Sequence, residues 1–255
     1  MLFLIGLGIG YKEISVRGLE ALKSSDSAMM ESYTVPVPSD YVKYLEGEFQ
    51  KPILMIKRSD MEENMRSTLA NAKNGTLAVL VPGDPLIATT HHKFIDKAHE
   101  MGIETAIFHA SSVLSSAISE SGLDAYKFGP TATVPFWSNN YKPTSFINLI
   151  SKNLDNKEHT LLLLDLDHRD SHPMKLSEAF QLIDSAEKAT SIKITGKSKK
   201  WLAMGNIGRE GQLIMYSDID TLKKNADKFD GKVSCIIVPS EVSFAEEESV
   251  SSHSV

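Results

Sequence analysis

The turn Pro82-Gly83-Asp84-Pro85 interrupts an apolar run and constrains the fold more than any other feature of this chain. The preceding residues, 76–81, read TLAVLV, which is typical of a strand buried on both faces of a parallel sheet. Ligands of open α/β sheets bind at the carboxyl ends of such strands. Gly83 lets the backbone approach a ligand closely, and Asp84 adds an acceptor-only group. The turn is therefore a candidate binding site, although Pro, Gly and Asp are also ordinary turn residues.

A second glycine-rich strand end lies at the amino terminus. Residues 2–5 form an apolar run, and Gly6-Leu7-Gly8-Ile9-Gly10 follows immediately. Glycines at alternate positions do not match the G-x-G-x-x-G spacing of a dinucleotide fingerprint. We therefore expect a loop that keeps its backbone close to a ligand, but not a nicotinamide site.

The order of elements alternates as a βαβ protein requires. Strands are predicted near residues 2–6, 53–56, 76–81, 103–108, 131–136, 160–166, 200–205, 211–216 and 233–238. We expect an N-terminal α/β domain over residues 1–110, a C-terminal α/β domain over 111–244, and a disordered acidic and serine-rich tail over 245–255. Two such domains leave a cleft between them, a common place for ligand sites.

Helices are predicted from the spacing of apolar residues. The stripe Met61, Met65, Leu69 and Ala72 predicts one helix over residues 60–73. Further helices are expected over residues 92–101 and 175–188. Residues 193–200 are predicted to form an exposed, mobile connection.

Composition excludes several classes of protein. The net charge of −6 argues against nonspecific binding of nucleic acid, which needs clustered Lys and Arg. The single cysteine, Cys235, forms no internal disulfide and lies in an apolar run, which fits a reducing cytoplasm. The first residues lack a basic segment and are interrupted by glycines, so neither a signal peptide nor a membrane span is predicted.

Several segments together resemble the diphthine synthases, a branch of the tetrapyrrole methylase fold family. The resemblance spans nearly the whole chain and rests on FLIGLGIG, ISVRGLEALKSSD, PGDPLIATTHH, FHASSV, GLDAYKFG, PFWSNNYKPTSF, HTLLLLDLD and CIIVP, in that order. It implies two α/β domains with S-adenosylmethionine in the inter-domain cleft, and a homodimer. It also implies a cytoplasmic enzyme that methylates the amino group of a 3-amino-3-carboxypropyl-modified histidine on translation elongation factor 2, to the trimethylated product.

The resemblance also implies a set of cofactor-binding residues that end strands or begin helices. These are Ile9, Asp84, Ile87, Ser112, Val113, Leu164, Ile207 and Ser234. The family usually has a histidine where this chain has Ser234, so one adenosine contact is altered. No metal is implied.

Methyl transfer needs positioning more than side-chain chemistry, because the sulfonium already activates its methyl group. No catalytic triad is present, and the catalytic residues are unknown. Tyr33, His91 and His109 are candidates for accepting the proton of the acceptor amine. Residues that could meet the acceptor are Phe136, Trp137, Tyr141, Lys142 and Arg17, each of which also fits an ordinary structural role.

Three other functions fit parts of the sequence. Asp165, Asp167 and His172 follow a predicted buried strand and would suit a metal-dependent hydrolase, although polar loops often have this composition. A module that binds elongation factor without methylating it is a second alternative. A tetrapyrrole methyltransferase of the precorrin type is the alternative within the same fold.

Overall fold

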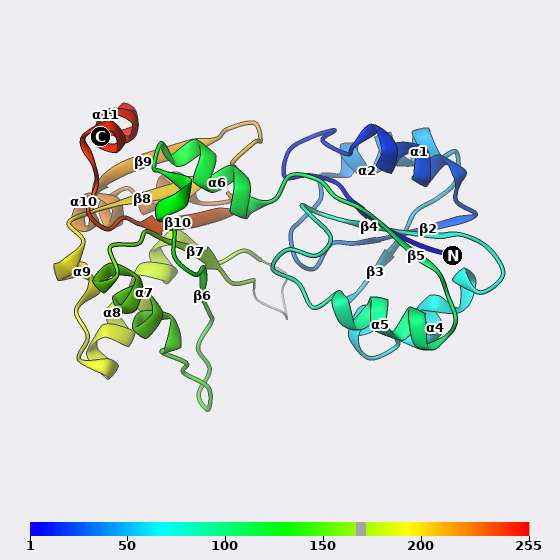
Figure 1. Ribbon diagram of the computed structural model, residues 1–255, viewed down its shortest axis with the longest axis horizontal. Helices are drawn as coiled ribbons and strands as arrows, with labels where there is room; N and C mark the ends of the chain where they lie inside the picture. The colour runs from blue at the N-terminus through cyan, green and yellow to red at the C-terminus, as the bar shows by residue number, and fades with distance from the viewer. Residues whose placement is uncertain (167–171, 255) are drawn as a thin grey trace. The chain divides into compact units, whose positions relative to one another are not determined.

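The chain divides into two compact units, Met1–Val113 (unit 1) and Leu114–Val255 (unit 2), in the computed structural model shown in Figure 1. The structure describes residues 1–166 and 172–254. Each unit contains one five-stranded sheet with helices, which confirms the predicted α/β class. The division falls slightly later in the chain than the predicted boundary after residue 110. Among the described residues, no helix has the length and apolar character needed to cross a bilayer.

Unit 1 is built on a fully parallel sheet with the strand order β3-β2-β4-β1-β5. Its strands are β1 (Leu2–Gly6), β2 (Ser27–Glu31), β3 (Leu54–Ile56), β4 (Leu77–Val81) and β5 (Thr105–Phe108). Because the strands are parallel, the loops that follow β4, β1 and β5 leave the sheet at the same edge.

Both faces of the unit 1 sheet are covered, as the continuous apolar runs predict. On β4, Ala78 and Leu80 pack with α1 (Val16–Ser24) and α2 (Ser39–Phe49). Alternate residues such as Val79 pack on the other face with α5 (His92–Glu100). Figure 1 shows α1 and α2 on one side of the strands and α5 on the other.

The single helix predicted over residues 60–73 is wrong. The segment forms three short pieces, α3 (Arg58–Glu62), α4 (Met65–Thr68) and a 3-10 turn, η1 (Leu69–Ala72). The amide of Asn64 donates to the carbonyl of Ser59, five residues back, which is a bond that ends a helix. The predicted stripe is still largely buried, since periodicity reports burial and not helix continuity.

Unit 2 has a mixed sheet with the order β6-β7-β10-β8-β9. Its strands are β6 (Ala132–Val134), β7 (Thr160–Leu164), β8 (Lys200–Gly205), β9 (Leu213–Asp218) and β10 (Ser234–Val238). Only β6 and β7 pair in parallel, and the other neighbours are antiparallel. The central strand β10 carries Cys235, which is buried and unpaired, and burial raises the pKa of its thiol to about 12.

The helices of unit 2 include α7 (Ser145–Asp155), α8 (Leu176–Thr190), α10 (Ile219–Lys224) and all but the first residue of α6 (Val113–Ser121). Side chains of α7 and α8, such as Ile147 and Phe180, share one apolar core with Trp201 and Ile236 from the sheet. The indole nitrogen of Trp201 donates to the Ser198 carbonyl at 3.2 Å, so its one polar atom is satisfied.

Residues 193–200 are mostly exposed, as expected, but they do not form an irregular connection. They contain a short helix, α9 (Ile194–Lys197), and Ile194 is fully buried. The backbone amide and the hydroxyl of Thr195 donate to the carboxylate of Glu187 at 2.8 and 3.1 Å. These bonds hold the segment in place, although its many lysines predicted a mobile connection.

The described part of the tail, residues 245–254, is also ordered, which corrects the prediction of disorder. It forms α11 (Phe244–Val250) and a 3-10 turn, η4 (Ser251–His253). Ser243 caps α11, while Glu246 and Val250 are buried. The buried carboxylate of Glu246 accepts from His159 at 2.9 Å and from Lys127 at 2.6 Å. These long-range bonds hold the tail in place, although it has few apolar side chains to bury.

Candidate functional site

The two glycine loops of the sequence meet at the carboxyl edge of the unit 1 sheet. The amide of Gly8 donates to the Gly83 carbonyl at 3.2 Å, and the amide of Gly83 donates to the Gly8 carbonyl at 2.9 Å. Both glycines have φ above +70°, a conformation that side chains disfavour. The loop after β1 and the turn after β4 are therefore one structural feature.

Gly6, the last residue of β1, allows this close approach. A Cβ atom built on Gly6 would lie 2.7 Å from the Gly83 carbonyl oxygen and 2.9 Å from the Cβ of Ala110. At Gly83, by contrast, the nearest atom would be the carbonyl oxygen of Ser111 at 3.9 Å. The added atom would therefore clash at Gly6 but find space at Gly83.

Asp84 joins the turn to the loop after β5. Its side chain is buried, with 7% exposure, and one carboxylate oxygen accepts from the Leu86 amide at 3.0 Å. The other oxygen accepts from Nδ1 of His109 at 2.8 Å and from the Ala110 amide at 3.4 Å. The carboxylate is an acceptor only, so Nδ1 of His109 carries the hydrogen. The His109 side chain is 68% exposed.

Glu13, which the sequence reading missed, joins the first loop to the same β5 loop. The Ile9 amide lies 3.1 Å from both Ser111 Oγ and a carboxylate oxygen of Glu13. Ser111 Oγ also donates to that oxygen at 2.6 Å. The only signal in the sequence was an acidic residue shortly after a glycine-rich strand end.

The remaining unit 1 candidates lie on the same loops. Ile87 is 37% exposed, which makes it an apolar side chain at the surface of the turn. Next to it, Ala88 has φ of +55°, a strained value for a residue with a Cβ. Ser112 is buried and directly precedes Val113, the first residue of α6. The structure thus brings Ile9, Asp84, Ile87 and Ser112 to connected loops.

Two of the three candidate proton acceptors are bonded to each other. His91 is buried, with Nδ1 2.9 Å from the Pro85 carbonyl and Nε2 3.1 Å from the Tyr33 hydroxyl. Burial lowers the pKa of His91 and raises the pKa of Tyr33. Both side chains therefore have partners within unit 1, whereas His109 has an exposed ring.

The unit 2 candidates lie at one edge of their own sheet. Leu164 ends β7, and Ser234 begins the antiparallel β10, where it pairs with Gly205 at the end of β8. Ile207 follows β8 and is 8% exposed, next to Asn206 with φ of +50°. The hydroxyl of Ser234 donates to the nearby carbonyl of Lys232 at 3.3 Å. Three residues far apart in the sequence are thus neighbours on adjacent strand ends.

Comparison with known proteins identifies the family. A family model described as Tetrapyrrole (Corrin/Porphyrin) Methylases matches residues 1–222, most of the chain. The chain belongs to this family. The methylase is 35% identical to a diphthine synthase of Methanothermobacter thermautotrophicus over 248 residues, covering 96% of this chain and 92% of that relative.

Two further relatives extend the comparison. An Arabidopsis thaliana protein named "Probable diphthine methyl ester synthase" is 30% identical to this methylase, covering 97% of this chain and 96% of the relative. A crystal structure of diphthine synthase superposes with a TM-score of 0.86 at 29% identity, covering 99% of this chain and 95% of that one. The methylase is accordingly an S-adenosylmethionine-dependent methyltransferase.

The unit 1 loops suit S-adenosylmethionine on the basis of their own geometry. A Cβ on Gly83 would meet no atom closer than 3.9 Å, and Ile87, four residues later in the same loop, is exposed. The carboxylates of Glu13 and Asp84 lie in the same loops, and opposite charge favours a positively charged sulfonium nearby. When bound, the donor supplies an activated methyl group.

The metal-site hypothesis gains nothing from the described residues. Both carboxylate oxygens of Asp165 accept backbone amides, from Leu166 at 2.9 Å and from Phe136 at 3.1 Å. The ring of His172 packs against the ring of Phe136, with centroids 5.7 Å apart. Asp167 lies outside the described residues. Over residues 1–166 and 172–254, no three His, Cys, Asp or Glu side chains are grouped to hold a metal ion.

The residues considered for contact with an acceptor differ in exposure. Phe136 and Trp137 pack against the unit 2 core, and the Trp137 indole donates to the Pro143 carbonyl at 3.1 Å. Tyr141 is 63% exposed. The guanidinium of Arg17 lies over the ring of Phe108, 5.9 Å from its centroid. Packing therefore accounts for Phe136 and Trp137, while Tyr141 remains available at the surface.

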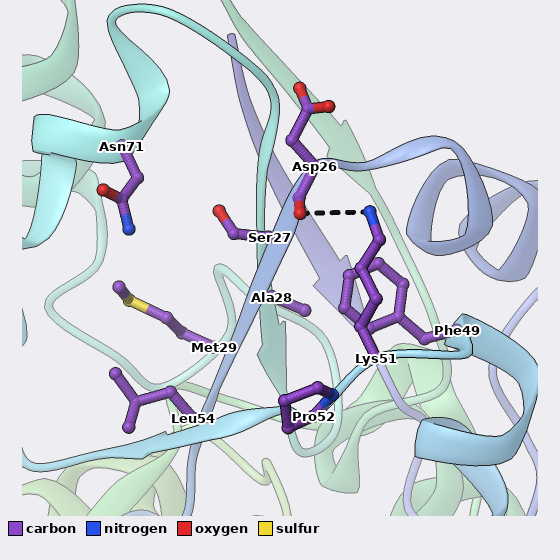
Figure 2. Close-up of a pocket in the computed structure, with 9 residues that line it drawn as sticks. All are labelled: Asp26, Ser27, Ala28, Met29, Phe49, Lys51, Pro52, Leu54 and Asn71. Carbon is purple, nitrogen blue, oxygen red and sulfur yellow. Dashed lines mark hydrogen bonds between the residues drawn. The ribbon is translucent and has the colours of Figure 1, made fainter.

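A separate pocket of about 340 Å³ lies elsewhere in unit 1 and contains no candidate residue. Figure 2 shows it beside Ser27, at the start of β2, which is the edge opposite the glycine loops. Nζ of Lys51 donates to the carbonyls of Ser25 and Asp26 at 3.0 and 3.1 Å. Lys51 therefore bonds to the backbone just before β2.

Proposed function

We propose that this methylase is a diphthine synthase. It transfers methyl groups from S-adenosylmethionine to the amino group of the 3-amino-3-carboxypropyl-modified histidine of translation elongation factor 2. The observation that carries the proposal is the Gly8–Gly83 bridge with the Asp84–His109 pair. It occurs in a chain that is 35% identical to a diphthine synthase across 96% of its length.

The proposed donor site consists of the loops described above. Ile9, Ile87 and Ser112 contribute backbone and apolar contacts, and Val113 contributes the first turn of α6. Asp84 acts mainly by holding the turn, because its carboxylate already accepts three hydrogen bonds. From unit 2, we assign Leu164 and Ile207 as apolar walls and Ser234 as the residue that replaces a histidine contact.

The acceptor amine must lose a proton before each attack, since an alkylamine is mostly protonated at neutral pH. Of Tyr33, His91 and His109, we favour His109. Its Nδ1 is bonded to Asp84, so the neutral ring presents an unprotonated Nε2 on an exposed side chain. Alignment of amine and methyl group supplies most of the acceleration, which for well-oriented reactants reaches roughly 7 to 11 kcal/mol.

The first experiment is calorimetric titration with S-adenosylmethionine, followed by a transfer assay on elongation factor 2 that carries the unmethylated modification. Saturable binding and incorporation at the modified histidine are the expected results. Methylation of a tetrapyrrole in the absence of any protein acceptor would instead support the alternative within the fold. Binding of elongation factor without transfer would support the non-catalytic module.

A second product is favoured by the name of the Arabidopsis relative, which describes a methyl ester. An ester requires transfer to the carboxylate of the same side chain in addition to the amine. Mass spectrometry before and after mild alkali distinguishes the two products. Loss of one methyl group on alkaline hydrolysis indicates the ester, and an unchanged mass indicates trimethylation of nitrogen alone.

We also propose a cytoplasmic homodimer. The lone, buried Cys235 suits a reducing compartment, and elongation factor 2 acts in the cytoplasm. Light scattering at several concentrations of the purified chain measures the oligomeric state directly.

A further inference from the structure

The turn that carries Asp84 is held in a strained conformation. Ala88 has φ of +55°, and such a value persists in a residue with a Cβ only where surrounding contacts enforce it. The contacts converge on the Pro85 carbonyl. It accepts from Nδ1 of His91 at 2.9 Å and from the Thr89 hydroxyl at 3.3 Å.

The tautomer of His91 follows from its partners. The Pro85 carbonyl only accepts, so Nδ1 of His91 must carry a hydrogen. The ring is buried, and burial lowers its pKa, so it is neutral near pH 7. Its Nε2 is then a pure acceptor, and the Tyr33 hydroxyl, 3.1 Å away, is the donor.

Tyr33 is fixed in turn by the end of β2. Its backbone amide donates to the carboxylate of Glu31 at 3.2 Å, and Glu31 has no exposed surface. The Tyr33 ring meets the His91 ring edge to face, with centroids 6.5 Å apart. A continuous set of contacts therefore runs from β2 through Tyr33 and His91 to Pro85.

We infer that His91, supported by Tyr33, is a positioning residue for the methyl donor, because it holds the turn of Pro85 and Asp84 in its binding conformation. The inference rests on the proposed donor site. It assigns His91 a role through the turn and no contact with the donor. If the turn occupies this conformation for only part of the time, the apparent affinity for the donor falls by that fraction.

The test uses two substitutions that separate the two ring nitrogens. In His91→Asn, the amide nitrogen occupies the position of Nδ1 and keeps a donor for the Pro85 carbonyl. In His91→Gln, the side-chain amide reaches the position of Nε2 and leaves that carbonyl without its closest donor. His92→Gln, at the exposed neighbouring position, is the matched control.

We expect His91→Gln to weaken S-adenosylmethionine binding about tenfold, and His91→Asn to stay within about threefold of the wild type. Tyr33→Phe removes only the second bond, so a loss of no more than about threefold is expected. Calorimetry gives the affinities, and thermal melting of each variant gives stability. A purely structural histidine would lower the melting temperature of both variants without separating their affinities for the donor.

A second readout needs no variant. The ¹⁵N chemical shifts of His91 in the labelled wild-type chain should report hydrogen on Nδ1 and a lone pair on Nε2. The opposite tautomer, or equal affinities for the Asn and Gln variants, overturns the inference. Failure of the folded wild type to bind S-adenosylmethionine would instead refute the proposed donor site, and the inference would fall with it.

Discussion

The two units place their buried carboxylates differently with respect to the proposed donor residues. In unit 1, Glu31 ends β2 and Asp84 follows β4, so both lie at the edge where the glycine loops leave the sheet. In unit 2, Glu246 bonds to His159, beside the start of β7, whereas Leu164 lies at the other end of that strand. Unit 1 therefore has buried carboxyl groups at its candidate site, whereas in unit 2 Glu246 fastens the end of the chain.

The pKa values of Glu31 and Glu246 shift in opposite directions. Burial raises the pKa of Glu31 to about 7, and hydrogen bonds from Thr34 and Tyr33 offset this only in part. Burial acts in the same sense on Glu246, but Lys127, two backbone amides and His159 hold the pKa of its carboxyl well below the usual range. A nearby cation decides whether a buried carboxylate stays charged.

Glu246→Ala should have the largest effect, because it removes the acceptor for His159 and Lys127 together. Breaking a buried ionic network leaves its partners unpaired, and we expect a loss of about 3 to 5 kcal/mol in the free energy of unfolding. Urea denaturation measures the loss, with Glu248→Ala on the exposed side of α11 as control. Weaker binding of S-adenosylmethionine by the folded Glu246→Ala variant would contradict the view that Glu246 only anchors the tail.

Glu31→Gln should change how stability depends on pH. The folded-state pKa of about 7 exceeds the ordinary 4.5, so the folded chain binds the extra proton between these values. The wild type should therefore lose stability relative to Glu31→Gln as pH rises through this window, by at most about 3 kcal/mol.

For Glu246→Gln the sign is reversed, because the folded-state pKa is lowered. The stabilisation from Glu246 is present above its ordinary pKa of 4.5 and is lost as pH falls. Denaturation curves of both variants between pH 2.5 and 8, against the wild type, test the pair. If the stability of the two variants relative to the wild type changed with pH in the same direction, the opposite pKa shifts of Glu31 and Glu246 would be contradicted.

Gly6→Ala should disturb unit 1 at the candidate site itself. The added methyl group would lie 2.7 Å from the Gly83 carbonyl oxygen, so the two loops must separate. Overpacking of this kind costs about 1 to 3 kcal/mol, and donor affinity should fall with it. Gly47→Ala is the control, since nothing lies within 4 Å of its Cβ position and alanine favours a helix. Unchanged donor binding by Gly6→Ala would remove this loop from the site.

Ser234→His has the smallest expected effect. It tests whether the apolar side chains of Leu164 and Ile207 suffice for donor binding without a histidine at position 234. If this position contacts the donor as the resemblance implies, a histidine here should tighten donor binding by no more than one hydrogen bond, about 0.5 to 1.5 kcal/mol. Calorimetry against the wild type measures it. No gain would show that Ser234 lies outside the adenosine contacts or that its apolar neighbours already suffice.

Secondary structure was predicted best from the sequence where glycine or proline ends an apolar run. Continuous apolar runs that stop at Gly6 and Pro82 predicted β1, β4 and the glycine loops beside them, because local propensity and burial agree there. Periodicity also placed α5 and α8. It failed over residues 60–73, where the apolar stripe is real but Asn64 ends the first helix.

The errors over the tail and at Glu13 depend on partners distant in the sequence. The tail is fixed by Glu246 binding His159, 87 residues earlier, and no property of the tail alone indicates that bond. Glu13 was missed for the same reason, since its role depends on Ser111, 98 residues away. Sheet topology brings such distant partners together, and the composition of a segment does not reveal that topology.

The position of β10 has a consequence for biosynthesis. Every strand of unit 1 has been made once residue 108 is in the chain, so its sheet can close while the rest is being translated. In unit 2 the central strand is the last to be synthesised, because β10 inserts between β7 and β8. Before residues 234–238 emerge, only the β6–β7 and β8–β9 pairs can form, each with an unpaired edge. The nascent chain therefore carries one finished half and one open half, and the open half is the part for which a chaperone would matter.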